Sequence, residues 1–199
     1  MKKFLMTAVL GMFALAGFSQ VKWDAKFGMN FSNMTKLDDA KALPGFNLGV
    51  GMDYGFSENW SLQSGLMISS KGYKYDKDVL GADFKARPIY LDIPILAAYK
   101  FNISDNTKFV INAGPYLAFG LGGKGKFDVD GAEDIKVFKG EEGMSRFDLG
   151  IQYGIGLEIS EHYLVNLTGQ NGFICPWDTE DGEDKPKNMT FSIGVGYRF

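Results

Sequence analysis

Basic and acidic side chains recur on the polar side of segments in which polar and apolar residues alternate. They are Lys22, Asp24, Lys26, Asp53, Lys100, Glu158 and Arg198. Opposite charges gathered in a confined space compensate one another, whereas a single enclosed charge is costly. Such a cluster has two interpretations: a selectivity or proton path, or a structural plug. We favour the plug, because narrow β-barrels are usually filled by their own side chains.

Few residues of the sequence are suited to catalysis or metal binding. His162 is the only histidine, and it lies in a short Ser-Glu-His segment, so no second histidine is available for a metal pair. No Ser-His-Asp set can be placed where a lipid-modifying enzyme would need it. The acidic stretch 178–184 could attract calcium, but it lacks the spacing of a calcium loop and we interpret it as a solvated loop. We therefore expect no catalytic, cofactor-binding or metal-binding residues and no cofactor.

The amino terminus has the organisation of a secretory signal peptide. Lys2 and Lys3 precede an apolar run over residues 4–16, and small residues follow at Gly17 and Ser19. The run is shorter than the roughly 20 residues of a membrane helix. We predict that residues 1–19 are a cleavable signal peptide and that residues 20–199 form one outer-membrane β-barrel domain. Removal of Lys2 and Lys3 leaves 19 basic against 24 acidic residues, a net charge of −5, which disfavours nucleic acid as a partner.

The remaining sequence contains eight segments with a two-residue hydrophobic period. They cover residues 21–32, 46–56, 60–71, 89–101, 109–121, 147–159, 163–170 and 190–199. Neighbouring residues of a strand point to opposite faces, so each segment predicts a strand with one apolar and one polar face. Pro94 cannot donate a ladder hydrogen bond, and we expect a bulge or local gap there. Cys175 is the only cysteine, so no disulfide within the chain holds these strands together.

The alternation predicts a barrel in a membrane rather than in water. The polar faces are rich in glycine, as at Gly49, Gly51, Gly150 and Gly154, and offer little cover to an outer surface, whereas the apolar faces are bulky. In hydrocarbon an open sheet edge is costly, so the sheet must close. The connections alternate between short and long, as in outer-membrane barrels. We predict an all-β, eight-stranded antiparallel up-and-down transmembrane barrel with its apolar face outward and both mature termini in the periplasm.

Aromatic residues fall at two places in this scheme. One set lies near the ends of strands joined by short turns, where it would form an interfacial girdle: Trp23, Tyr54, Phe56, Trp60, Tyr99, Phe101, Phe109, Tyr163, Tyr197 and Phe199. A second set lies in the long connections, where it could bind a partner or pack together over the barrel mouth: Tyr73, Tyr75, Phe84, Phe127, Phe138, Phe173 and Trp177.

Four motifs in sequence order carry a family resemblance. They are YLDIPILAAYKF, NAGPYLAFGLGG, RFDLGIQYGIGLEI and FSIGVGYRF. With these motifs the chain resembles the PorT-like family of outer-membrane β-barrel proteins, over essentially the whole mature sequence. The resemblance implies a barrel fold and an outer-membrane location, and the named member of the family is linked to protein secretion. The final residues also look like the signal read by the barrel-assembly machinery, through Phe191, Ile193, Val195, Tyr197 and Phe199.

These observations favour a non-enzymatic outer-membrane protein with a structural or interaction role in the cell envelope of a Gram-negative bacterium. The family resemblance implies one specific form of that role, namely that the protein is a component of a protein-secretion assembly. The alternative is a small-molecule channel or ligand-binding barrel, and an enzyme acting on lipid is a third. The expected partners are outer-membrane lipid, the barrel-assembly machinery during biogenesis, and an envelope protein that contacts the external loops or the periplasmic turns.

Overall fold

The computed structural model describes residues 21–129, 134–138, 143–177 and 185–199. The predicted signal peptide, 1–19, and the acidic stretch 178–184 lie outside the described residues. Within the described ranges, no helix is long and apolar enough to cross a membrane. The elements are β1 (Val21–Thr35), β2 (Lys41–Gly55), β3 (Trp60–Ser70), β4 (Tyr73–Tyr75), α2 (Lys77–Leu80), β5 (Phe84–Ser104), β6 (Thr107–Phe127), β7 (Ile135–Lys136), β8 (Phe147–Ile159), β9 (Tyr163–Gly172) and β10 (Lys187–Arg198).

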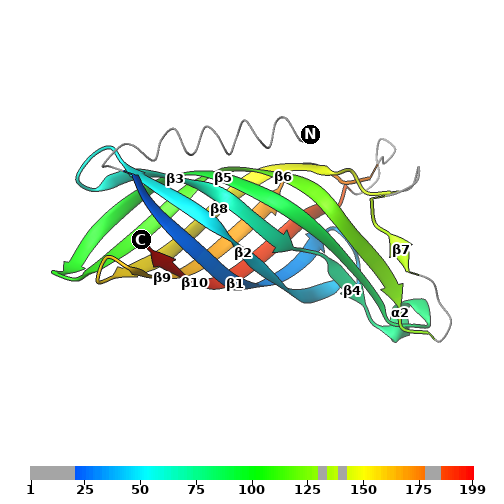
Figure 1. Cartoon of the computed structure of the whole chain (residues 1–199). Helices are drawn as coiled ribbons and strands as arrows, with labels where there is room; N and C mark the ends of the chain where they lie inside the picture. Colours follow the sequence, from blue (N-terminus) through cyan, green and yellow to red (C-terminus); the bar gives the residue numbers. More distant parts are fainter. Residues whose placement is uncertain (1–20, 130–133, 139–142, 178–184) are drawn as a thin grey trace.

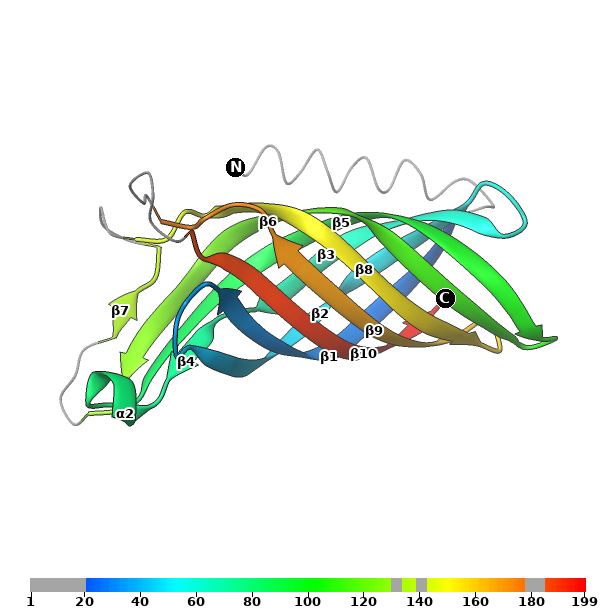
Figure 2. The same ribbon diagram turned by 180° about the vertical axis from the view of Figure 1, so that it is seen from behind.

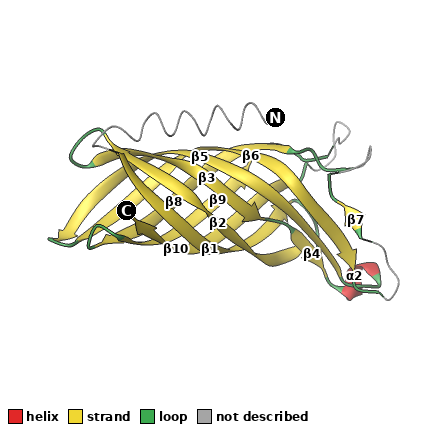
Figure 3. Cartoon of the chain, viewed as in Figure 1, coloured by secondary structure: helices red, strands yellow, loops and turns green. Residues whose placement is uncertain are grey.

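Eight strands close into a barrel. The sheet contains ten strands, and all except β4 and β7 form a ring in which each strand pairs with its neighbours in the order β1-β2-β3-β5-β6-β8-β9-β10. Antiparallel pairing of β1 with β10, from Asp24↔Arg198 to Thr35↔Lys187, closes the ring. Figures 1 and 3 show the tilted strands surrounding a single axis. The predicted eight-stranded antiparallel up-and-down fold is confirmed.

The apolar side of each strand points outward. Ile151 and Ile155 of β8 are exposed on the outer surface, whereas Asp148 of the same strand is 2% exposed and lies inside. The pattern is the same on β10, where Ile193 and Val195 face out. Bulky apolar residues therefore cover the exterior of the barrel, and glycine and polar residues occupy the interior. This distribution is the reverse of a soluble barrel, which buries its apolar side chains around the axis.

Proline interrupts the ladder where the sequence predicted a gap. The β5–β6 pairing passes from Pro94↔Tyr116 directly to Ala97↔Ala113 without a change of register. The Ser64 hydroxyl donates a hydrogen bond to the Pro94 carbonyl oxygen at 2.7 Å. The two register shifts of this pairing lie at other places: between Asn102 and Ser104, and between Ile89 and Tyr90, where β6 carries an extra residue at Leu121.

Several strands are longer than the alternation predicted, and β5 and β6 extend furthest beyond it. Residues 72–87 and 122–146 were expected to be connections, but they contain β4, the start of β5, the end of β6 and β7. Beyond the barrel these strands form what we call the outer sheet, from the start of β2 through β4, β5 and β6 to β7. It extends past one end of the barrel in both views (Figures 1 and 2). The segment was missed because lysine and glycine replace apolar residues where the strands leave the barrel.

The aromatic residues of the long connections pack mainly on one another. Tyr73, Tyr75, Phe84, Phe138 and Trp177 join a cluster around buried Met34 and Met144 at the end of the barrel that carries the outer sheet. The Phe127 ring lies 4.7 Å from the Phe84 ring, centroid to centroid. Phe173 remains exposed. The inner side of the outer sheet is thus covered by its own aromatic cluster.

Candidate functional site

Four charged side chains meet inside the barrel near its short-turn end. Lys100 Nζ lies 2.7 Å from Asp53 Oδ2 and 3.0 Å from Glu158 Oε1. Arg198 Nη1 lies 2.8 Å from Glu158 Oε2, and its Nη2 lies 3.2 Å from Asp53 Oδ2. Each cation therefore contacts both carboxylates. We call this group of two acids and two bases the inner layer.

The inner layer spans the lumen because of where its members lie in the ring. Asp53 belongs to β2, Lys100 to β5, Glu158 to β8 and Arg198 to β10, which are alternate strands of the eight. Inward side chains from alternate strands of a barrel lie at the same height and form a layer across the axis. Gln63 of β3 completes the group by donating a hydrogen bond from Nε2 to Asp53 Oδ2 at 2.9 Å. The layer is buried, with Asp53 2% and Arg198 3% exposed.

The other predicted members of the charge cluster lie beside this layer. Asp24 is buried on β1, and its Oδ1 lies 3.2 Å from Lys26 Nζ. Lys22 is different, because its side chain is 47% exposed and its ion-pair partner is Glu161, at 3.8 Å, in a short turn. The structure therefore brings Lys22 to the rim of the barrel and not into the buried network. Lys22 has the same strand parity as Asp24, but it lies beyond the last enclosed level.

A second group of buried charges lies near the opposite end and was not singled out from the sequence. Lys71 Nζ lies 3.1 Å from Asp92 Oδ1 and 4.7 Å from the centre of the Tyr116 ring. The Tyr116 hydroxyl donates to Asp148 Oδ2 at 3.0 Å. Together with the Tyr90 ring, 5.3 Å from Lys71 Nζ, these residues form what we call the outer cluster. Strand parity places Asp92 and Asp148 on the polar faces, and that parity was the signal available for finding them.

Phe138, from the connection between β6 and β8, covers the outer cluster. Its ring meets the Tyr90 ring edge to face at 5.5 Å, and the Arg146 guanidinium lies 5.2 Å from its centre. Gly120 is required beneath it, because a Cβ atom at this position would lie 2.5 Å from the Phe138 ring. Arg146 Nη1 also donates to the Gly120 carbonyl oxygen at 2.7 Å, which fixes the segment on the barrel mouth.

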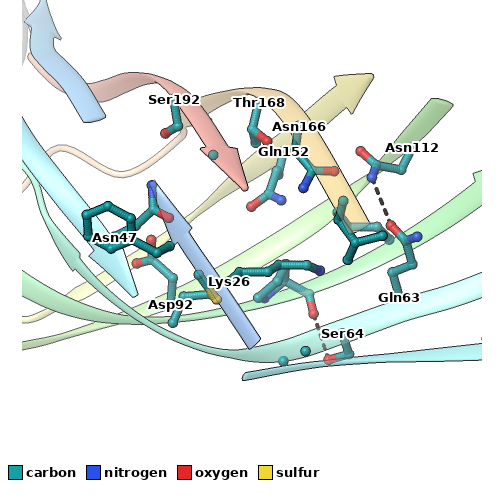
Figure 4. A pocket seen from close by; sticks show the side chains of 18 of the residues that line it. Lys26, Asn47, Gln63, Ser64, Asp92, Asn112, Gln152, Asn166, Thr168 and Ser192 are labelled. Carbon is teal, nitrogen blue, oxygen red and sulfur yellow. Dashed lines mark hydrogen bonds between the residues drawn. The ribbon is translucent and has the colours of Figure 1, made fainter. Parts of the chain in front are cut away.

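Amide and hydroxyl groups line a cavity of about 110 Å³ in the middle of the lumen. Figure 4 shows Asn47, Asn112, Gln152 and Ser192 around this space. Some of the wall groups bond to each other, as where Gln170 Nε2 donates to Gln152 Oε1 at 2.8 Å. A polar cavity of this size has room for several water molecules. The cavity borders Glu158 and Arg198 of the inner layer, and a second cavity at the short-turn mouth borders Asp53 and Lys100.

The remaining candidate residues occupy structural positions. His162 Nδ1 lies 2.8 Å from the Arg198 carbonyl oxygen, and its ring stacks on Tyr197 at 5.5 Å. Over the described part of the chain, no three His, Cys, Asp or Glu side chains come together as a metal site. Cys175 is partly exposed as a free thiol. The alternate residues of the closing strand lie on the outer surface, namely Phe191, Ile193, Val195, Tyr197 and Phe199.

Comparison with known proteins agrees with this architecture. The sequence matches the outer membrane protein β-barrel domain family over residues 15–174. No curated protein matches it.

Three of the solved structures that are similar to the chain show the extent of the likeness. Neisserial surface protein A has 16% identity and a TM-score of 0.51, covering 89% of this chain and 97% of that one. Ail of Yersinia pestis, solved with a heparin analogue, has 18% identity and a TM-score of 0.46, covering 90% and 99%. OprG of Pseudomonas aeruginosa has 15% identity and a TM-score of 0.48, covering 89% and 95%. These likenesses concern the fold alone. The family match extends over well more than half of the chain, and the protein therefore belongs to the outer membrane protein β-barrel domain family.

Proposed function

We propose that this protein is a sealed, non-enzymatic barrel that presents its outer sheet and loops to other components of the cell envelope. The observation that carries the proposal is the inner layer. Two acids and two bases from alternate strands contact each other across the whole lumen at 2.7–3.2 Å. A solute that passed this level would have to separate charge pairs in a space from which water is largely excluded, and that separation is costly.

The outer end adds a second closure. Tyr90 and Tyr116 are fully buried in the lumen, and Phe138 packs on them from outside. The central cavity is therefore bounded by charge pairs on one side and by aromatic rings on the other. Such an arrangement favours a scaffold over a pore. If the barrel nevertheless transported or bound a small molecule, the amide-lined central cavity is where that molecule would lie.

Solute flux tests the sealed lumen. The mature protein in liposomes or planar bilayers should give neither sugar leakage nor a steady conductance. A Phe138→Ala variant should also remain closed, because the inner layer is untouched. Leakage is expected only when Phe138→Ala is combined with Lys100→Ser and Glu158→Ser, which remove half of the inner layer. A steady conductance through the wild-type barrel would overturn the proposal in favour of the channel.

The orientation in the membrane follows from the unequal connections. Short turns join β2 to β3, β5 to β6 and β8 to β9 at one end, whereas the outer sheet lies at the other. We infer that the outer sheet faces the outside of the cell, that the mature chain is residues 20–199 after removal of 1–19, and that both mature termini are periplasmic. Exposed aromatic and aliphatic residues at alternate positions of β10 fit a role as the signal for the assembly machinery.

Native Cys175 provides a direct test of orientation. It lies in the connection after β9, at the same end as the outer sheet, and is partly exposed. A membrane-impermeant maleimide should therefore label it in intact cells. In a Cys175→Ser background, Glu58→Cys in an exposed short turn should be labelled only after the outer membrane is permeabilised. The opposite pattern would reverse the assigned orientation.

The PorT-like resemblance supports a more specific role as a component of a protein-secretion assembly. Cross-linking in intact cells tests it, with photoreactive groups placed in the outer sheet and in the short turns. A reproducible neighbouring envelope protein at either position supports an interaction role, and a neighbour required for secretion supports the assembly. Cross-links confined to lipid would exclude this more specific role and leave the scaffold in the membrane.

A further inference from the structure

The outward side of the outer sheet carries an unusual concentration of positive charge. Register pairs Lys41 with Lys74, Lys74 with Lys85, and Lys85 with Lys126, so one row of four lysines crosses four strands. A second row, closer to the barrel, pairs Arg87 with Lys124 and Lys124 with Lys136. We call these seven residues the basic face: Lys41, Lys74, Lys85, Arg87, Lys124, Lys126 and Lys136.

A β-bulge places two of these seven residues on the outward side. In the barrel, β6 directs even-numbered residues such as Tyr116 and Ala118 inward. The register shift at Leu121 reverses this parity, because Tyr90 pairs with Gly120 but Ile89 pairs with Gly122. Lys124 and Lys126 consequently face outward beside Arg87 and Lys85. Bulges commonly redirect side chains in this way. If the register of the barrel continued without the shift, Lys124 and Lys126 would lie opposite Ala86 and Phe84, on the side of the aromatic cluster.

The folded protein does not neutralise the basic face. Like charges directly opposite one another on a sheet are destabilising. Two carboxylates offset part of the repulsion: Asp76 pairs with Lys41 and Lys74, and Asp134 pairs with Lys124 and Lys126. Hydrogen bonds from Lys41 and from Lys124 lower the pKa of Asp76 and of Asp134, respectively, so both carboxylates already carry full charge at neutral pH.

Three members of the basic face keep their charge uncompensated. Within the described ranges, Lys85, Arg87 and Lys136 form no ion pair. Arg87 and Lys136 are also exposed to the surroundings of the protein. The surplus of positive charge is therefore available to a partner.

Taking Ile89 as the edge of the hydrocarbon places the basic face near the height of the lipid headgroups. Arg87 and Lys85 continue the outward side of β5 beyond Ile89, at two and four residues, on the side that meets lipid lower down. With a rise of about 3.3 Å per residue, these positions are about 7 and 13 Å along the strand from Ile89. A headgroup layer is about 5–8 Å thick on each side of the hydrocarbon. Strand tilt reduces the heights further, which brings the row closer to the barrel, Arg87, Lys124 and Lys136, into the layer of phosphates.

We propose that the basic face binds lipids whose phosphate headgroups carry net negative charge, in the leaflet at this end of the barrel. The lipid chains would lie against the apolar exterior of β5 and β6, and the phosphates would lie between the two rows of basic residues. This arrangement explains why like charges are set opposite one another in a sheet that has no acidic strand to pair with them. The inference depends on the barrel being in a membrane and is independent of a sealed lumen and of orientation in the cell.

Photolabelling in vesicles tests the proposal. The mature protein is reconstituted in phosphatidylcholine with trace photoreactive phosphatidic acid or trace photoreactive phosphatidylcholine, and labelled residues are located by mass spectrometry. Phosphatidic acid should label residues 84–91 and 117–127 about five-fold more than phosphatidylcholine, the factor that corresponds to one basic residue near a lipid phosphate. The preference should decrease in high salt, which screens exposed charges.

Substitutions test whether the lipid preference comes from the basic face or from positive charge anywhere on the protein. Lys85→Gln, Arg87→Gln, Lys124→Gln and Lys126→Gln together should bring the labelling ratio at this site close to one. If the fourfold variant folds poorly, the double variant Arg87→Gln and Lys124→Gln is used instead, and it should reduce the labelling ratio partially. A control with Lys22→Gln and Lys108→Gln, at the other end of the barrel, should leave it unchanged. Equal labelling by both lipids in the wild type would overturn the proposal, and protection of the site by inositol hexakisphosphate would then assign the face to a soluble polyanion.

Discussion

The inner layer and the outer cluster compensate their buried carboxylates in different ways. The inner layer balances two carboxylates with two cations, and every cation contacts both carboxylates. The outer cluster has Lys71 as its one cation against Asp92 and Asp148. Asp148 relies on neutral donors, with hydrogen bonds from the Tyr116 hydroxyl at 3.0 Å and from Asn188 Nδ2 at 2.9 Å. Its second oxygen, Oδ1, has no hydrogen-bond partner among the described residues.

This difference predicts how much stability each group loses when one of its cations is removed. Loss of one cation from the inner layer leaves another in contact with both carboxylates. Loss of Lys71 leaves two buried carboxylates without any cation in their cluster, at a level covered by aromatic rings. Breaking a buried ion pair from one side is strongly destabilising because the remaining charge is uncompensated. The outer cluster should therefore be the more sensitive of the two.

The largest effect is expected from Lys71→Met. The variant should lower the free energy of unfolding by about 3–5 kcal/mol. Urea unfolding in lipid vesicles, followed by tryptophan fluorescence, measures the change. Addition of Asp92→Asn to Lys71→Met should recover part of the loss. A loss similar to that of an exposed lysine, such as Lys136→Met, would contradict the assigned role of Lys71.

Lys100→Met should cost less, although it removes two ion pairs. Arg198 continues to contact Asp53 and Glu158, so neither carboxylate is left without a cation. We expect a loss of about 2–3 kcal/mol, the range for hydrogen bonds to charged groups. The same unfolding assay compares it with Lys71→Met, and an equal or larger loss would show that the inner layer is not redundant.

Gly120→Val should disturb the outer end alone. The added side chain would occupy the space of the Phe138 ring, and displacement of that ring should cost about 1–3 kcal/mol, as in other overpacked sites. Hydrogen exchange should increase in residues 134–138 and 143–146 and remain unchanged near Lys100. Phe138→Ala serves as the matched control, because it removes the same contact without overpacking. Spread of the increase to the inner end would show that the two levels are coupled.

The smallest effect is expected from Asp148→Asn in the outer cluster, which is compared with Glu158→Gln in the inner layer. In Asp148→Asn the amide oxygen still accepts hydrogen bonds from Tyr116 and Asn188, and the excess negative charge disappears. The free energy of unfolding should therefore change by less than about 1 kcal/mol, the net contribution of one hydrogen bond. Glu158→Gln instead removes a charge that Lys100 and Arg198 both use, and it should cost about 1.5–3 kcal/mol. A reversed order of these two effects would mean that the charge balance of the two groups is misassigned.

The sequence by itself determined the architecture of the barrel and one of its charge groups. Strict alternation in segments such as 147–159 fixes which side chains face the lipid, because a strand offers only two faces. The same parity indicated that Asp53, Lys100, Glu158 and Arg198 share the interior, since each lies near a strand end at the short turns. The alternation did not identify the outer sheet, where lysines take the outward positions of apolar residues.

Only the tertiary structure decided which enclosed charges meet and which residues cover them. The meeting of Lys71 with Asp92 and Asp148 depends on strand stagger, which brings together positions far apart along the chain. The parity change at Leu121 and the seating of Phe138 over Gly120 depend on one extra residue in β6 and on a returning connection. A two-residue period specifies a face, but height along the axis and register between strands arise when the ring closes, and these determine the contacts.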